Sequence, residues 1–403
     1  MGTARRGFWV GAGVLLLVGA LASSGPAHES FKAAARLHTL IVGGGPDAKH
    51  NQVAIESNVR YVSRLLPVDA TSRVLFTDGD PLSKNVLCED PDEKTYYRAP
   101  QIARIDGPSS PEQIQQELFH LSNDAVSTPT SPVLLYFTGH GSPNYSSQYA
   151  NNNYDLWNDK HLTVKDLAGS LQAFPKQTPI TLVMVECFSG AFGNLLFKDA
   201  DAKGDLANLN VCGFFASVAQ RMAAGCTSEV NEANYRDFTS YFFAALTGTD
   251  RTGRKVTGAD YNHDGKVGMN EAFAYSLIHD DSIDTPVCTS DVFLRRFVES
   301  TDSEVLSTPF RTVQSWASPS QLAALNALSD ATGFTGDDGL GRAFDFFSHM
   351  RMDSDEPKEV KTLRLVRLAK SIILGHRLMA SSDEALKSKF TALLKLESAN
   401  PLR

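Results

Sequence analysis

Short apolar runs alternate with helical patterns over the first half of the chain. Runs rich in β-branched and aromatic residues predict strands, and they occupy residues 37–42, 73–76, 133–137, 180–185 and 211–216. Helical patterns lie between several of these runs, after Asn51, from Pro111, and over 162–174. Residues 80–110 show neither pattern and are expected to be a polar loop. Strands that alternate with helices predict an α/β fold with a mainly parallel sheet covered on both faces.

The last part of the chain has a different pattern. Residues 319–330 and 358–397 show helical periodicity, and the glycine-rich, acidic stretch TGFTGDDGLG separates them. We therefore expect residues 35–310 to form one α/β domain and residues 311–403 to form a helical C-terminal extension.

The N-terminus has the pattern of a secretory signal peptide. Arg5 and Arg6 precede an apolar segment, Phe8 to Leu21, which is too short to span a membrane as a helix, and small residues follow it. We expect residues 1–27 to be removed on export, which would leave a periplasmic or extracellular protein with no stable membrane insertion. An uncleaved N-terminal anchor is the alternative.

Composition bears on the expected binding partners and on the pairing of the cysteines. Hydrophobic residues make up 42% of the chain and charged residues 21%, and the formal net charge is −8, as in an ordinary globular protein. No basic stripe with interleaved aromatic residues is present, so nucleic acid is not an expected partner. Because the number of cysteines is odd, at least one has no partner within the chain, and sequence does not settle the pairing of Cys88, Cys187, Cys212, Cys226 and Cys288.

Two predicted strands end in residues that can carry nucleophilic chemistry. The run LLYFTGHGS places His140 after the third strand, and ITLVMVECFSG places Cys187 after the fourth. Because the carboxyl ends of parallel strands meet at one edge of a sheet, both side chains should lie at the same edge. A cysteine attacks as a thiolate, and an imidazole nearby can take its proton and later give it to a leaving amine.

The glycines beside the histidine suit the same reaction. Gly141 leaves its backbone N–H uncovered, and together with the N–H of Cys187 it could hold an oxyanion. Taken singly, a buried thiol and a turn histidine would be ordinary structural residues. Their joint position predicts a His140–Cys187 catalytic dyad with no organic cofactor.

The order of these blocks resembles the legumain-type cysteine peptidases, whose clan also contains caspases and gingipains. The resemblance covers residues 37 to 250 and lies in YFTGHGS (136–142), LTVKDL (162–167) and VECFSG (185–190). It implies a caspase-like α/β/α sandwich and an endopeptidase that cleaves peptide or protein substrates after Asn or Asp. Some members of the family also act as peptide ligases.

The sequence departs from this family at the substrate pocket. Members usually carry a glutamate two residues before the cysteine, whereas this chain has Val185 there and places Glu186 next to Cys187. The departures affect the expected specificity more than the expected peptidase activity. The substrate-binding candidates are Asn51, which could instead cap a helix, with Glu186, Ser217 and Asp237.

Residues 260–271, DYNHDGKVGMNE, fit the pattern of an EF-hand calcium loop. The ligand positions are Asp260, Asn262, Asp264, Lys266 through its carbonyl group, and Glu271. Gly265 stands where the loop needs its sharp turn. The sequence therefore predicts one structural Ca²⁺ site, with an acidic solvated turn as the alternative.

Together these features predict an exported cysteine endopeptidase that acts through a His–Cys dyad. The alternatives are a calcium-stabilised module that binds peptides or proteins without cleaving them, and a peptide ligase or transpeptidase. By analogy with eukaryotic legumains, residues 311–403 could be an inhibitory segment that covers the active site. They could equally be an extension that packs on the catalytic domain.

Overall fold

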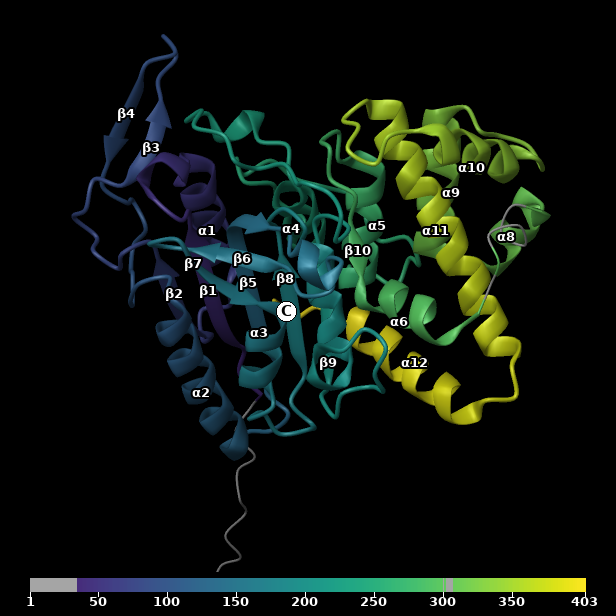
Figure 1. Ribbon diagram of the computed structural model, residues 1–403, viewed down its shortest axis with the longest axis horizontal. Coiled ribbons are helices and arrows are strands. Elements are labelled where there is room, and N and C mark those ends of the chain that lie inside the picture. Colours follow the sequence, from purple (N-terminus) through teal and green to yellow (C-terminus); the bar gives the residue numbers. More distant parts are fainter. Residues whose placement is uncertain (1–34, 300, 302–306) are drawn as a thin grey trace, which may run out of the picture. The chain divides into compact units, whose positions relative to one another are not determined.

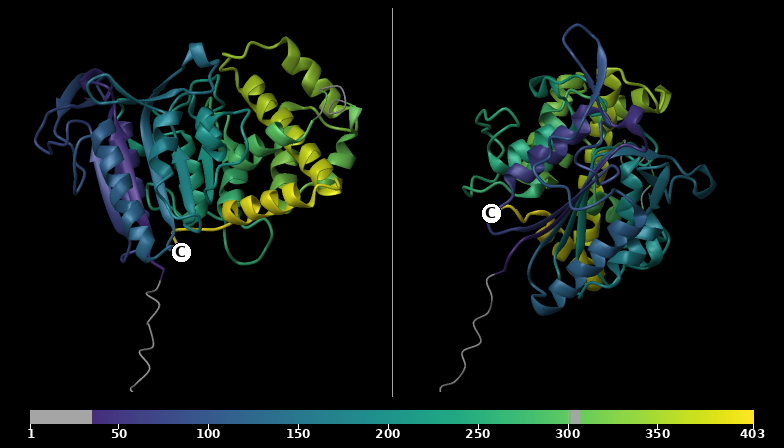
Figure 2. Two further views of the ribbon diagram at one scale, coloured as in Figure 1. Left: turned by 60° about the horizontal axis from the view of Figure 1, so that its bottom comes forward. Right: turned by 90° about the vertical axis from the view of Figure 1, so that its left-hand side faces the viewer.

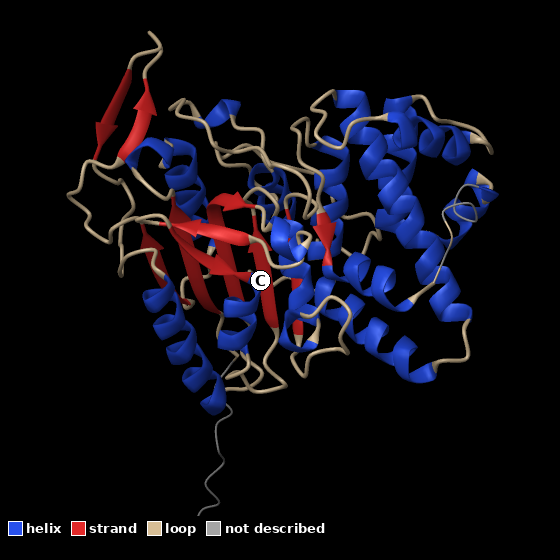
Figure 3. Cartoon of the chain, in the orientation of Figure 1, coloured by secondary structure: helices blue, strands red, loops and turns tan. Residues whose placement is uncertain are grey.

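A mainly parallel sheet lies at the centre of the fold (Figures 1 and 3). The computed structural model describes residues 35–299, 301 and 307–403, so the predicted signal peptide lies outside the described residues. The strands of the sheet run in the order β10-β9-β8-β5-β1-β2. All neighbours in this order are parallel except β10 and β9. The bounds are β1 (His38–Gly44), β2 (Thr71–Phe76), β5 (Val133–Ser142), β8 (Ile180–Met184), β9 (Val211–Phe215) and β10 (Val287–Cys288).

The strand sequences explain this sheet. Every residue of β8 (ITLVM) and of β9 (VCGFF) is buried. Continuous apolar runs of this kind are typical of parallel strands that are covered on both faces, whereas a half-exposed strand would alternate. The predicted α/β fold with a mainly parallel sheet is confirmed.

Helices cover both faces of the sheet (Figure 2). Helices α1 (Val53–Leu65) and α4 (Phe238–Thr247) pack together on one face, and α2 (Pro111–Ser127) and α3 (Val164–Leu171) pack together on the other. The Ser110 side chain accepts the N–H of Gln113 and caps α2, which begins at Pro111. Asn51 does not N-cap α1, because the N-cap position of that helix is Gln52.

Two hairpins were not expected from the sequence. Residues 80–110 contain the antiparallel pair β3 (Val86–Glu89) and β4 (Thr95–Arg98), so the prediction of a loop was wrong there. A second pair, β6 (Asn153–Leu156) and β7 (Lys160–Thr163), continues the sheet at the end of β5. Its pairing extends β5 to Ser142, because β6 supplies backbone partners to that segment. His140 therefore lies in a strand and not in the loop that was expected to follow one.

The C-terminal extension is helical, as predicted, and shares its core with the rest of the chain. Helix α5 (Met269–His279) contributes Ala274 and Leu277 to an apolar cluster with α9 and α11. Phe390 and Leu393 of α12 belong to the core that surrounds the sheet. Residues 35–403 thus form one folding unit. The remaining helices are α6 (Thr289–Phe297), α8 (Phe310–Trp316), α9 (Pro319–Thr332), α10 (Gly339–His349), α11 (Pro357–Ala380) and α12 (Glu384–Glu397).

Short helical turns complete the described part of the chain. The 3-10 helices are Ala48–His50, Tyr145–Ser147, Ser189–Leu196, Lys198–Ala200 and Glu232–Asn234. Within the described ranges, no helix has the length and apolar character needed to cross a membrane.

Candidate active site

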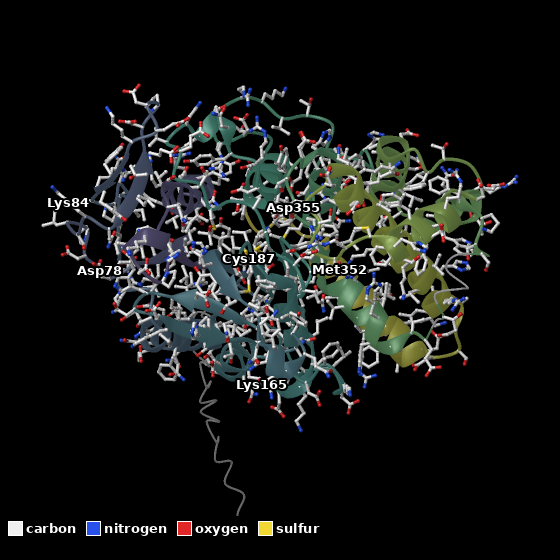
Figure 4. All side chains as sticks on the ribbon, turned by 45° about the horizontal axis from the view of Figure 1, so that its top comes forward. Asp78, Lys84, Lys165, Cys187, Met352 and Asp355 are labelled. Atoms are coloured by element: carbon white, nitrogen blue, oxygen red, sulfur yellow. The ribbon has the colours of Figure 1, made fainter. Side chains whose placement is uncertain are left out.

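His140 and Cys187 lie at the same edge of the sheet. Strands β5 and β8 are parallel neighbours, with Phe137 opposite Met184, and each of the two candidate residues comes three positions later. The strand order places them side by side at the carboxyl ends, as the sequence predicts. Figure 4 labels Cys187 among the surrounding side chains.

The backbone N–H and carbonyl groups of Ala223 both contact the Cys187 thiol. The N–H of Ala223 donates to Sγ at 3.3 Å, and the thiol lies 3.7 Å from the carbonyl oxygen of the same residue. Burial raises the pKa of Cys187 to about 11, while the Ala223 N–H acts in the opposite direction. The resting group at neutral pH is therefore a thiol, which needs a base before it can attack.

A strained turn follows the thiol. Phe188 has a φ of 62°, in the left-handed region, which costs on the order of 1–3 kcal/mol for a residue with a side chain. Its N–H donates to the carbonyl oxygen of Arg221 at 2.8 Å. The turn directs the chain from β8 into the 3-10 helix Ser189–Leu196 and leaves Cys187 at its corner. Strained turns of this kind cluster at functional sites.

His140 contacts Gln52 and a second cysteine. Its Nε2 lies 3.0 Å from Oε1 of Gln52, and its Nδ1 lies 3.8 Å from Sγ of Cys226. Within the described part of the chain, no hydrogen bond joins His140 to Cys187 directly. Burial lowers the pKa of His140, so its ring is neutral at pH 7. Because Nε2 donates to the Gln52 oxygen, Nδ1 is the atom that can accept a proton.

Cys226 is a second thiol of this site, and sequence reasoning did not single it out. Its Sγ also lies 3.8 Å from the carbonyl oxygen of Gly139, and it follows Ala223, which contacts Cys187, by three positions. The residue is exposed to solvent, and partial desolvation of its thiol beside His140 raises the pKa of Cys226. All the cysteines of the chain are among the described residues, and none forms a disulfide. Their odd number was the only signal for an additional free thiol.

Gly141 lies directly against the backbone of Cys187. A Cβ atom at position 141 would stand 2.2 Å from the carbonyl oxygen of Cys187 and 2.8 Å from Cγ of Glu186. Real Cβ atoms do not approach other atoms this closely. Only glycine therefore lets the end of β5 lie so close to the loop that follows β8.

Two of the four substrate-binding candidates hold loops in place. The side chain of Asn51 donates to the carbonyl oxygen of Asn85 at 2.8 Å and accepts the N–H of Gly45 at 3.3 Å. The hydroxyl of Ser217 donates to the carbonyl oxygen of Met222 at 3.0 Å. Both side chains are completely buried. Their role in binding substrate stays a prediction.

Asp237 is also an interior residue. Its carboxylate caps α4 by accepting the N–H of Ser240 at 2.8 Å. It also accepts the amide of Asn58 at 3.0 Å and lies 3.5 Å from the guanidinium of Arg251. These partners explain why Asp237 is conformationally fixed and buried. The structure does not bring it together with Asn51 and Ser217 on an open surface.

Glu186 is the unusual member of the four. Its side chain is buried, and neither carboxylate oxygen has a hydrogen-bond partner. Burial raises its pKa well above the ordinary value, and the charge of Asp155 acts in the same direction. Burial thus favours the protonated, neutral form of this carboxyl group.

This buried acid predicts a pH-dependent stability. A carboxyl group whose folded pKa is raised binds a proton that the unfolded chain releases, so stability falls as pH rises from its ordinary pKa of 4.5 through the folded value. We expect Glu186→Gln to be about as stable as wild type near pH 5. At about pH 8 it should be more stable, by about 1.4 kcal/mol for each pH unit of the window. Thermal melts over this range test it, and parallel curves for the two proteins would contradict it.

The predicted calcium loop folds as a tight turn. The N–H of Asp264 donates to the side-chain oxygens of Asp260 at 3.2 Å and Asn262 at 2.8 Å. Gly265 has a φ of 82°, which gives the sharp turn expected at its position. The oxygen donors of this turn are thus gathered together, and oxygen is the donor atom that Ca²⁺ prefers.

The rest of the loop is ordered by backbone donors. Glu271 accepts the N–H groups of Tyr261 at 2.9 Å and Gly268 at 3.0 Å, and the N–H of Lys266 donates to Asp264 at 2.9 Å. In the described ranges, no group of three or more His, Cys, Asp or Glu side chains has the arrangement of a metal site. The residue types fit calcium, and its binding stays a prediction.

Comparisons with known proteins find only distant structural similarity. No protein-family model matches the sequence, and a search of curated proteins finds no match. Similar solved structures include a Geobacter sulfurreducens protein at 11% identity, covering 63% of this chain and 92% of that chain with a TM-score of 0.36. They also include the Drosophila initiator caspase Dronc at 11% identity, covering 52% and 62% with a TM-score of 0.30.

A further similar structure is a secreted cysteine protease from Bacteroides thetaiotaomicron. The identity is 11%, the match covers 68% of this chain and 74% of that chain, and the TM-score is 0.31. TM-scores this low carry no argument about either fold or function. The fold class therefore rests on the strand order and pairing described above.

Proposed function

We propose that this chain is an exported cysteine endopeptidase of the caspase-like type, with Cys187 as the nucleophile and His140 as the general base and acid. One observation carries the proposal. The Cys187 thiol, held by the Ala223 N–H, shares a sheet edge with the neutral imidazole of His140, whose Nδ1 contacts the neighbouring thiol of Cys226. Export is inferred from residues 1–27, which lie outside the described residues.

The proposed reaction uses these groups in two stages. Nδ1 of His140 takes the proton from Sγ of Cys187, and the thiolate attacks the carbonyl carbon of the scissile peptide bond. The N–H groups of Gly141 and Cys187 hold the oxyanion, and His140 returns the proton to the leaving amine. Water then attacks the acyl-thioester with His140 as base, which releases the carboxylic acid and restores the thiol. Since the Cys226 thiol lies next to Nδ1, one of these side chains must rotate when Cys187 reacts.

Peptide profiling tests the proposal. We would incubate residues 28–403 with Ca²⁺ and a mixed peptide library, beside Cys187→Ala, and identify the products by mass spectrometry. Cleavage by the parent chain alone is the expected result, and the cleaved bonds would test the preference for Asn or Asp that the family resemblance implies. No cleavage from acid to neutral pH would reject the peptidase proposal.

The buried positions of the four substrate-binding candidates favour one alternative function, a module that binds peptides without cleaving them. A module that binds peptides without cleaving them needs no polar pocket beside the thiol, and it would retain peptides from the library without producing fragments. A peptide ligase would instead be recognised in the same experiment by products longer than the substrates.

We further propose that residues 260–271 bind a structural Ca²⁺ ion. Extracellular calcium modules bind with dissociation constants of about 10⁻⁴–10⁻³ M. At about 10 mM Ca²⁺, binding of this strength would increase the free energy of unfolding by about 1.4–2.7 kcal/mol. We therefore expect calcium to raise the melting temperature by a few degrees relative to chelator. Differential scanning calorimetry with and without calcium measures this shift.

Two variants make the calcium test specific. Asp264→Ala should lose the shift, because it removes one of the gathered oxygen donors. Asp250→Ala is the matched control, since Asp250 accepts the N–H of Thr252 in a similar exposed turn outside the loop, and it should keep the shift. An identical melting temperature of the parent chain in calcium and in chelator would reject the calcium site.

A further inference from the structure

We infer that the C-terminal extension builds part of the active site, and that Arg364 of α11 is a positioning residue for Cys187. The inference deepens the proposed function and rests on the role of Cys187 given there. It follows from a continuous set of buried contacts between α11 and the thiol.

The first step is the set of hydrogen bonds from Arg364 to the loop 280–284. Its guanidinium donates to the carbonyl oxygens of Asp284 at 2.7 Å, Asp280 at 2.6 Å and Ser282 at 3.1 Å. The Asp280 carboxylate lies 3.8 Å away, and both side chains are completely buried. A planar guanidinium has five donors in a fixed arrangement, so this one side chain can set the path of the whole loop.

The second step leads from this loop to the thiol. The buried carboxylate of Asp284 accepts the N–H of Ala224 at 2.6 Å and the N–H of Phe238 at 2.9 Å. Ala224 follows Ala223, whose N–H and carbonyl groups both contact Sγ of Cys187. The position of the Ala223 N–H is therefore set through Asp284 by a side chain of the extension.

A second contact holds the other end of the same segment. The guanidinium of Arg221 donates to the carbonyl oxygens of Ser354, at 2.7 Å, and Met352, and it lies 3.7 Å from the carboxylate of Asp355. The Arg221 carbonyl oxygen accepts the N–H of Phe188, which follows Cys187. Figure 4 labels Met352 and Asp355 together with Cys187. Residues 221–226, which touch both thiols of the site, are thus fixed by the extension at two points.

This arrangement argues against an extension that is shed to release activity. Removing α11 would leave buried carbonyl groups in the loop 280–284 without donors, and it would leave the Asp280 carboxylate without its cation. Buried groups that lose their partners destabilise their surroundings strongly. Loss of the extension should therefore disorder residues 221–226 and disable Cys187.

The charged and titratable groups around Cys187 come from several elements. Glu186 precedes it, Asp284 faces it from the loop 280–284, and Cys226 faces it from the segment 221–226. Burial raises the pKa of Cys187, whereas the Ala223 N–H lowers it. The N–H is thus the favourable contact that the thiolate would lose if the segment moved.

The test compares two arginines of the same helix in the full chain. Arg364→Met removes the donors to the loop, and Arg364→Lys keeps a cation with part of the contacts. Arg367→Met is the matched control, because the guanidinium of Arg367 pairs with Asp291 of α6 at 2.5 Å, away from the carbonyl groups that Arg364 binds. Hydrogen–deuterium exchange of peptides that cover residues 221–226 measures whether Arg364 fixes this segment. The kcat and KM for a cleaved peptide measure the effect on peptide hydrolysis.

We expect exchange at residues 221–226 to be about tenfold faster in Arg364→Met, intermediate in Arg364→Lys, and unchanged in Arg367→Met. We also expect Arg364→Met to lower kcat about tenfold and to change KM by less than about twofold, because the thiol and not the substrate contacts would be displaced. Unchanged exchange in folded Arg364→Met, or the same change in Arg367→Met, would overturn the inference. Failure of both Arg364 variants to fold would also overturn it, in favour of a role in the fold as a whole.

The outcomes separate this inference from the peptidase proposal. If exchange responds as expected but no protein, wild type included, cleaves peptides, the positioning of residues 221–226 by Arg364 is supported and the peptidase proposal fails. If wild type cleaves peptides and exchange at residues 221–226 does not respond, the inference alone fails.

Discussion

Replacing Cys187 with alanine is expected to lower peptide hydrolysis by about 10³-fold or more. The substitution removes the sulfur that would form the acyl-thioester, and the smaller apolar side chain fits a site where the thiol is partly buried. The measurement is kcat/KM for a peptide that the library identifies. Unfolding curves of both proteins would show that the loss is not a loss of folding.

The matched variant is Cys226→Ala. Cys226 is the thiol in contact with Nδ1 of His140, so it is the strongest competitor for the role of nucleophile. Its sulfur lacks the backbone N–H donor that Ala223 gives to Cys187, and we expect its removal to change kcat/KM by less than about tenfold. Loss of hydrolysis in Cys226→Ala, with activity retained in Cys187→Ala, would transfer the nucleophilic role to Cys226.

Gly141→Ala is expected to remove nearly all activity and to destabilise the protein by about 1–3 kcal/mol. The new methyl group would overlap the carbonyl oxygen of Cys187, which is a backbone atom and cannot turn away as a side chain can. The end of β5 and the Cys187 loop would have to separate, and the proposed oxyanion donors would separate with them. Denaturant unfolding and kcat measure the two effects.

Gly169→Ala is the control for this substitution. Gly169 is an exposed residue of α3, and no atom outside the backbone of its own helix and its chain neighbours lies within 4 Å of the added Cβ. The same chemical change there should leave activity unaltered and stabilise the helix by about 0.5–1 kcal/mol. Wild-type activity in Gly141→Ala would show that the close approach of the two backbones is not needed for the reaction.

The central strands and several helix ends could be predicted because their signals are local. Parallel strands buried on both faces form continuous apolar runs, which is why residues 180–185 and 211–216 were recognised as β8 and β9. The Ser110–Pro111 pair begins α2 through contacts within one turn. The short hairpins were missed because strands such as β4, whose side chains are mostly exposed, carry no apolar pattern and depend on their partners for hydrogen bonds.

The residues of the candidate site also fall into those that local sequence patterns predict and those that only the tertiary structure places. The sequence by itself predicted that His140, Gly141 and Cys187 would lie at one edge of the sheet, because the carboxyl ends of parallel strands share an edge. The direct pairing of β5 with β8 was decided by the tertiary structure. Only the tertiary structure decided that Cys226 would lie on His140, and that Asp237 would be enclosed by other side chains. These outcomes, like the path from Arg364 through Asp284 to the thiol, depend on side chains brought together from positions far apart in the chain. Contacts of this kind leave no periodic trace in the sequence, since each residue alone is compatible with many environments.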